Sequence, residues 1–92
     1  MTRCAREALA EADRLVRRGH VVVLLKGTHP TWLVALCPCR CGEILRVNLM
    51  TTAEPAWRVT VSARGSTTVW PSLIVTPCGS HFWATDGRVR WA

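Results

Sequence analysis

The chain has 92 residues and a formal net charge of +6, and hydrophobic residues make up 49% of it. This length predicts one small domain over residues 1–92, and the hydrophobic content excludes a disordered chain. No apolar run approaches the roughly 18 residues of a transmembrane helix, and the start of the chain lacks an apolar signal core. We therefore expect a soluble, cytoplasmic protein that does not contact a membrane.

An N-terminal helix is predicted for residues 4–18, within a segment of residues 1–19. Thr2 is a candidate N-cap, and Gly19 is a candidate C-cap behind the basic last turn. Apolar residues recur at helical spacing, so the helix should place a mostly alanine face against a sheet or a partner. These residues are Ala5, Ala8, Leu9, Ala12, Leu15 and Val16.

Residues 20–92 are predicted to form a β-rich core of antiparallel hairpins. The apolar run 21–25 is typical of a strand buried on both faces, and a turn at 27–30 leads to a second strand over 31–36. Pro71 should limit the strand around it to a sheet edge or a break. Alternating or extended sequence predicts further strands over 43–50, 57–63, 67–70 and 72–76.

The last hairpin has the clearest turn signal, because Asp86-Gly87 is a preferred pair for a two-residue type I′ turn. This turn predicts four cross-strand pairs: Thr85 with Arg88, Ala84 with Val89, Trp83 with Arg90, and Phe82 with Trp91. One face is expected in the core and carries Phe82, Ala84, Val89 and Trp91. The other face offers a candidate binding patch made of Trp83, Arg88 and Arg90, in which a Trp–Arg pair could stack.

The five cysteines favour metal binding, because no signal sequence directs the chain to a compartment where disulfides form. Four of them occur in two turn clusters, at residues 37–42 and 77–81. With His81 the two clusters offer one ligand more than a tetrahedral zinc ion needs. We therefore expect Zn²⁺ as a structural cofactor.

Spacing predicts a ligand set of three thiolates and one imidazole. Cys41, Cys78 and His81 are three of its members, since Cys78 and His81 are three residues apart. The fourth ligand is either Cys39, through a Cys-x-Cys spacing, or Cys37, through a longer one. The predicted fold class is therefore α+β, mostly β. It comprises a small antiparallel sheet of hairpins, a zinc site between two zinc-ribbon-like knuckles, and one N-terminal helix.

A catalytic alternative arises from Glu43, which follows Cys41 and Gly42 as in zinc-dependent deaminases and hydrolases. In deaminases three ligands hold zinc, a water completes the coordination and a Glu transfers protons. Those motifs begin helices, whereas strands are expected after both clusters here, so this is the lesser alternative. A nucleophilic pair of Cys78 and His81 is weaker still, because both lie in one turn without an orienting Asp.

Over residues 20–92 the chain resembles a bacterial family of short Cys/His-rich proteins, a domain of unknown function. The resemblance rests on Cys37-Pro38-Cys39-Arg40-Cys41-Gly42, Trp57, the run from Thr67 to Leu73, Cys78-Gly79-Ser80-His81-Phe82-Trp83 and Gly87-Arg88-Val89-Arg90-Trp91. It implies a zinc-binding β-rich domain with Cys39, Cys41, Cys78 and His81 at the ligand positions and Cys37 in the same cluster. Some members are encoded beside bacterial ubiquitin-like proteins, E1-like and E2-like enzymes and JAB-type peptidases, in operons associated with antiviral defence.

These observations predict a non-catalytic, zinc-stabilised adaptor that binds a protein. The resemblance implies an E1-like, E2-like or ubiquitin-like partner, and Trp83, Arg88 and Arg90 are the candidate contact residues. Nucleic-acid binding is the main alternative, because the chain is basic and interleaves Arg with Trp. The two hypotheses differ in salt dependence, which should be steep for a nucleic-acid complex.

Overall fold

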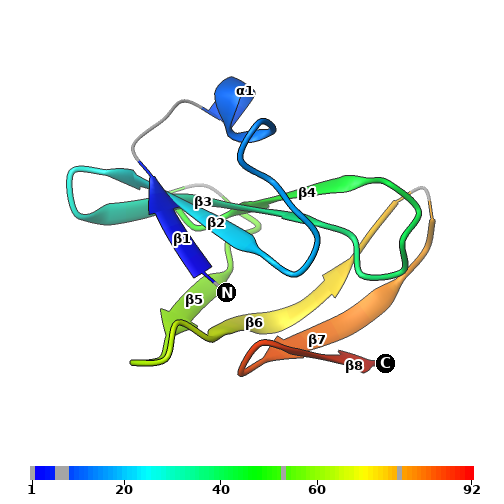
Figure 1. Cartoon of the computed structure of the whole chain (residues 1–92). Helices are drawn as coiled ribbons and strands as arrows, with labels where there is room; N and C mark the ends of the chain where they lie inside the picture. Colours follow the sequence, from blue (N-terminus) through cyan, green and yellow to red (C-terminus); the bar gives the residue numbers. More distant parts are fainter. Residues whose placement is uncertain (1, 6–8, 53, 77) are drawn as a thin grey trace.

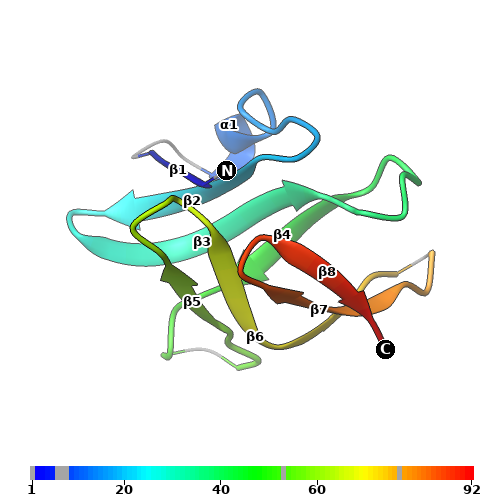
Figure 2. The same cartoon turned by 60° about the horizontal axis from the view of Figure 1, so that its bottom comes forward.

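Two four-stranded β-sheets face one another in the computed structural model, which describes residues 2–5, 9–52, 54–76 and 78–92 (Figures 1 and 2). Sheet A has the order β1-β2-β3-β4, and its strands are β1 Thr2–Ala5, β2 Val21–Lys26, β3 His29–Leu36 and β4 Ile44–Asn48. Sheet B has the order β5-β6-β7-β8, and its strands are β5 Arg58–Val61, β6 Thr67–Ile74, β7 His81–Thr85 and β8 Arg88–Trp91. All pairs are antiparallel except β1 with β2, which is parallel.

The predicted α+β fold class with a helix over residues 4–18 is wrong. Thr2–Ala5 forms β1, and a single helical turn, α1 (Leu9–Ala12), is the only helix among the described residues. Residues 6–8 of the expected helix lie outside the described residues. The physical reason is tertiary pairing. Strand β2 presents an open edge, and β1 satisfies its hydrogen bonds in a register that runs from Thr2 opposite Val21 to Ala5 opposite Leu24.

Sheet A is buried on both faces, which explains the continuous apolar run of β2. On one face Val22, Leu24 and Val34 pack with Ala12 of α1. The segment after α1 is fixed by Arg46 of β4, which donates a hydrogen bond of 2.7 Å to Asp13. The N-terminal segment therefore covers one face of sheet A, although it is not the expected helix.

The other face of sheet A shares one apolar core with sheet B. From sheet A and its loops this core takes Val23, Leu33, Ala35, Cys37, Val47 and Leu49, and from sheet B and its loops it takes Val69, Leu73, Val75 and Phe82. The two sheets also meet at the start of β1, where the Thr2 amide donates to the Gly65 carbonyl at 3.0 Å and the Thr2 and Thr67 hydroxyls are hydrogen-bonded. Sheet B therefore has a buried inner face and a solvent-exposed outer face.

The last hairpin forms with the expected register, from Thr85 opposite Arg88 to Phe82 opposite Trp91. Asp86 and Gly87 have φ values of +50° and +75°, as a type I′ turn requires. The expectation that the whole inner face of this hairpin is core holds only for β7. Val89 and Trp91 of β8 remain 41% and 53% exposed, because β8 is the edge of its sheet.

Pro71 neither ends β6 nor makes it an edge strand. Strand β6 lies between β5 and β7, and its register shifts between Val69 and Leu73, at the proline. An irregularity of this kind is where an inner strand can accept a residue without an N–H. Among the described residues no helix is long and apolar enough to cross a membrane.

Candidate metal centre and serine–histidine pair

Four thiols converge at one end of the molecule, where the β3–β4 loop of sheet A meets the β6–β7 loop of sheet B (Figure 1). The Sγ atoms of Cys37, Cys39, Cys41 and Cys78 all lie within 4.8 Å of one another. The Cys37–Cys39 and Cys37–Cys78 separations are 3.4 Å and 3.8 Å. Zn–S bonds of about 2.3 Å in a tetrahedron place sulfur atoms about 3.8 Å apart, so this four-thiol cluster has the dimensions of a closed tetrathiolate site.

Local backbone geometry places these thiols. In the first loop the Cys37 amide donates to the Glu43 carbonyl at 2.9 Å, and the loop closes through Gly42 with a φ of +91°. This left-handed conformation favours glycine. In the second loop the Val75 amide donates to Ser80 at 2.8 Å, and Gly79 donates back to Val75 at 2.7 Å.

The thiols of the cluster differ in acidity. Burial raises the pKa of Cys37 to about 12. Hydrogen bonds, first from Ser80 and then from the neighbouring thiols, lower the pKa of Cys39 to about 6. Ser80 also lowers the pKa of Cys78. A divalent metal would replace the protons that this cluster otherwise shares, since thiolates are the binding form.

A second constellation lies on the outer face of sheet B. His81 Nε2 is 2.8 Å from Ser72 Oγ, and both side chains are solvent-accessible. His81 is the first residue of β7 and pairs with Ile74, so Ser72 is its diagonal neighbour on β6. A serine hydroxyl that donates to a neutral imidazole is the arrangement from which His can remove the proton during nucleophilic attack.

Trp57 positions the backbone of this serine. Its indole Nε1 donates to the Ser72 carbonyl at 3.2 Å, and its own amide donates to Asn48 at 2.8 Å. Trp57 therefore connects β6 at Ser72 to the end of β4. Within the described part of the chain no carboxylate is hydrogen-bonded to His81, so the constellation is a pair and not a triad.

The site residues expected from the sequence lie in two locations, the four-thiol cluster and the outer face of sheet B. It brings Cys37 and Cys39 together in one cluster, where the sequence had made them alternatives. His81 bonds to Ser72 and is not a member of the four-thiol group, so ligation by His81 stays a prediction. Trp83, Arg88 and Arg90 lie on the outer face of sheet B, the face that carries Ser72 and His81.

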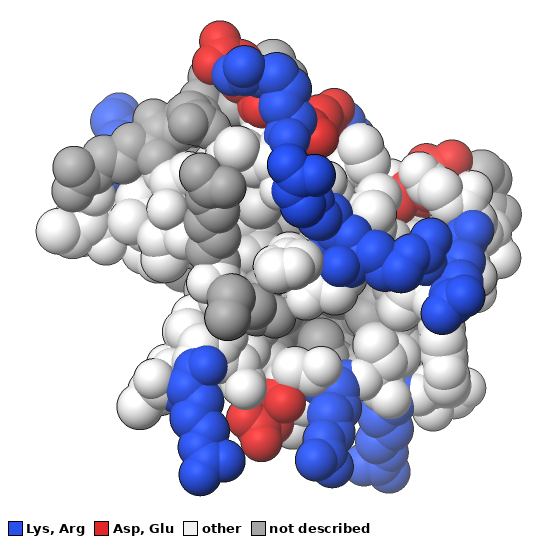
Figure 3. All heavy atoms as spheres, viewed as in Figure 1, with Lys and Arg blue, Asp and Glu red and all other residues white. Residues whose placement is uncertain are grey.

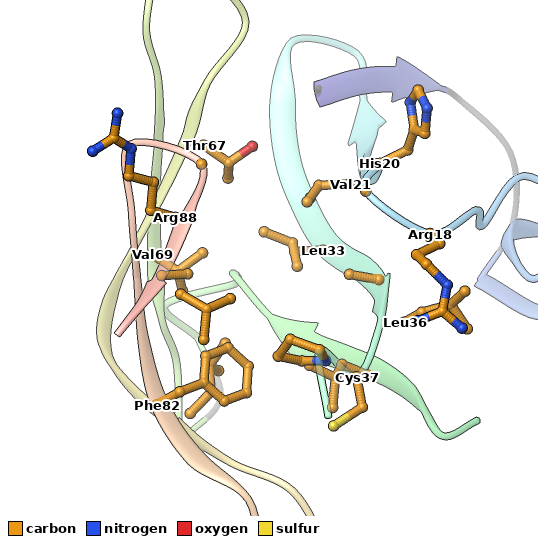
Figure 4. A pocket seen from close by; sticks show the side chains of 18 of the residues that line it. Arg18, His20, Val21, Leu33, Leu36, Cys37, Thr67, Val69, Phe82 and Arg88 are labelled. Atoms are coloured by element: carbon orange, nitrogen blue, oxygen red, sulfur yellow. The ribbon is translucent and has the colours of Figure 1, made fainter. Parts of the chain in front are cut away.

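An apolar cavity of about 290 Å³ lies between the two sheets (Figure 4). Leu33 from sheet A and Val69 and Phe82 from sheet B line it, and Cys37 lies at one end. On the side of sheet B it is lined mainly by inner-face side chains, and neither Ser72 nor His81 is among its lining residues. The cavity is therefore separate from the serine–histidine pair.

Residues 7–92 match a protein family described as the bacterial ubiquitination-like system serine protease (BubE). The chain belongs to the BubE family. The expected membership of a bacterial family linked to ubiquitin-like conjugation is thus confirmed. No curated protein and no solved structure matches the chain. The description of BubE names a serine protease, which directs attention to the serine that the imidazole contacts.

Sequence reasoning missed Ser72 as a functional residue of this BubE chain. The signal was present, because Pro71-Ser72 and His81 both lay within the motifs that carried the family resemblance. Two strands joined by a short connection are normally antiparallel neighbours, so residues 72 and 81 could have been placed close together. His81 had instead been assigned to the metal on the basis of its spacing from Cys78.

Proposed function

We propose that this protein is a serine peptidase of a bacterial ubiquitination-like system, with Ser72 as nucleophile and His81 as general base. The observation that carries the proposal is the 2.8 Å contact between Ser72 Oγ and His81 Nε2 on an accessible face. The family description supports the class of reaction. We propose as substrate the ubiquitin-like protein of the same system, cleaved after a peptide or isopeptide carbonyl.

The pair can perform acyl transfer with the groups that are present. His81 Nε2 takes the hydroxyl proton as Ser72 Oγ attacks the carbonyl carbon. The resulting imidazolium returns the proton to the departing amine, which leaves an ester on Ser72. A water then attacks this ester while His81 accepts one of its protons. As the bond between the carbonyl carbon and Ser72 Oγ breaks, the imidazolium gives that proton to Ser72 Oγ, and the acyl group leaves as a carboxylic acid.

The metal in this proposal is structural zinc, held by Cys37, Cys39, Cys41 and Cys78. Four thiolate ligands would complete a tetrahedral site and leave no position for a water, which argues against the deaminase-like alternative. Cys78 lies between Ser72 and His81 in the sequence. A metal there would fix the β6–β7 loop to sheet A and hold the ends of β6 and β7 in register.

The direct test is cleavage by the zinc-loaded full chain of the system's ubiquitin-like protein fused to a C-terminal reporter. Wild type should release the reporter, and Ser72→Ala should not. His29→Ala is the matched control for changes at His81, because His29 is an exposed histidine of β3 in the other sheet. Equal cleavage by wild type and Ser72→Ala would refute the proposal.

The adaptor and nucleic-acid roles expected from the sequence stay predictions, as do the cytoplasmic location and the single-domain organisation of residues 1–92. An adaptor needs no accessible nucleophile beside a base. The Ser72–His81 contact therefore favours catalysis over a purely binding role.

A further inference from the structure

The most exposed large apolar side chains among the described residues flank Ser72. Trp70 is 60% exposed and Ile74 is 66% exposed, and each is two residues from the serine along β6. Their immediate neighbours Val69, Leu73 and Val75 are buried in the shared core. The large apolar side chains of Trp70 and Ile74 are therefore exposed to solvent on either side of Ser72.

Register places these side chains on the face that carries the catalytic pair. Ile74 pairs with His81, and Ser72 contacts the same imidazole. Trp70 pairs with Arg58 on β5, whose neighbour Val59 packs against the inner core. We call this surface the outer face of sheet B; it comprises Arg58, Trp70, Ser72, Ile74, His81, Trp83, Arg88 and Arg90.

The charged side chains on the strands of this face are arginines, and Asp86 in the β7–β8 turn is the acidic residue next to them. Arg90 lies opposite Trp83, Arg88 lies opposite Thr85, and Arg58 lies opposite Trp70. The four strands of sheet B contain no Asp or Glu. Figure 3 shows mostly basic side chains projecting from the lower edge of the molecule, where Figure 1 draws sheet B.

We propose that the outer face of sheet B binds an extended acidic protein segment, with apolar side chains on both sides of the scissile bond in contact with Trp70 and Ile74. The inference rests on the proposed function, because it places the scissile carbonyl at Ser72. An extended peptide advances about 3.3 Å per residue and alternates its side chains, as β6 does. A segment lying along β6 therefore presents apolar groups to Trp70 and Ile74 while Arg58, Arg88 and Arg90 attract its acidic residues.

The test uses binding to the zinc-loaded Ser72→Ala chain, so that it does not depend on turnover. The probe is a fluorescein-labelled peptide with leucine on both sides of its central bond and glutamates at both ends. We expect Trp70→Ala and Ile74→Ala each to raise the Kd about 10-fold, the lower end of what a lost apolar contact costs. Trp70→Phe should restore most of the affinity, and Val61→Ala, an exposed apolar residue elsewhere on sheet B, should leave it unchanged.

Two further peptides test the chemistry of the occupant. Replacing the leucines by serine, or the glutamates by lysine, should each weaken binding by about 10-fold or more. In the active chain, Trp70→Ala should raise KM for the leucine peptide more than it lowers kcat.

The inference is overturned if both Trp70→Ala and Ile74→Ala bind the peptide as tightly as the parent. A single-stranded oligonucleotide that binds this face more tightly than the peptide also overturns it. If the peptide binds in the expected pattern but wild type cleaves nothing, the proposed function fails and the peptide-binding face stands.

Discussion

Ser72 and His81 are nine residues apart in the sequence and lie on neighbouring antiparallel strands, with 2.8 Å between Oγ and Nε2. The connection between them carries Cys78, a member of the four-thiol cluster. The catalytic pair and the metal cluster therefore share one short segment of chain.

Removing either member of the pair should abolish hydrolysis. We expect Ser72→Ala and His81→Ala each to lower kcat by about 10³–10⁶-fold, and the double variant to be no worse than the single ones. The losses are not additive because each residue acts only through the other. Steady-state kinetics on the reporter fusion measures this, with melting temperatures as a check on folding. If the loss of kcat in the double variant equalled the product of the two single losses, Ser72 and His81 would not act in the same step.

Metal content of single variants decides the ligand set. We expect Cys37→Ser and Cys39→Ser both to lose tightly bound zinc, because both thiols belong to the cluster. His81→Ala should retain one zinc per chain by elemental analysis. Cys4→Ser is the matched control, since Cys4 is an exposed thiol outside the cluster. If His81→Ala loses zinc while Cys37→Ser or Cys39→Ser keeps it, the histidine-containing set expected from spacing is correct.

Chelation of the metal should destabilise the whole fold. The ligands come from loops of two sheets, so the apo protein loses a cross-link that the unfolded chain cannot form. A loss of about 2 kcal/mol already lowers Tm by roughly 8–16 °C for a domain of this size. Thermal melts followed by circular dichroism, with and without chelator, measure the change. An unchanged Tm after complete metal removal would contradict a structural role.

Thiol reactivity should follow the acidity of the cluster. In metal-free protein at pH 7, Cys39 should be alkylated by iodoacetamide faster than Cys37. The Cys39 pKa of about 6 leaves mostly reactive thiolate, whereas the Cys37 pKa of about 12 keeps that buried thiol protonated.

Peptide mass spectrometry at short reaction times gives the order of labelling. Zinc should protect all four cluster thiols and leave Cys4 reactive, so Cys4 serves as the internal reference. Faster labelling of Cys37 than of Cys39 would contradict the described environment.

Local sequence signals predicted the parts of the fold that local interactions decide. Asp86-Gly87 determined both the turn and the register of the last hairpin, because few residue pairs adopt two successive left-handed conformations. The thiol cluster was also predictable in part, since the first turn carries three cysteines within five residues, and Cys78 joins them from the second turn.

Contacts between residues far apart in the sequence determined the features that the sequence did not predict. Residues 4–18 have helical periodicity, but a helix this short is marginal by itself, and Thr2–Ala5 instead pairs with the open edge of β2. The ligand set remained open because spacing alone does not show that β7 directs His81 toward Ser72. Val89 and Trp91 were expected in the core because alternation identifies a face but not whether another sheet covers it.

The most direct test of the central claim is covalent labelling of the zinc-loaded chain with a fluorophosphonate, followed by peptide mass spectrometry. Such probes phosphonylate a serine, with loss of fluoride, when a neighbouring base activates it. We expect one adduct, on Ser72, that is absent in Ser72→Ala and in His81→Ala and present in His29→Ala. No adduct on Ser72, or equal labelling of Ser72 in His81→Ala, would contradict it.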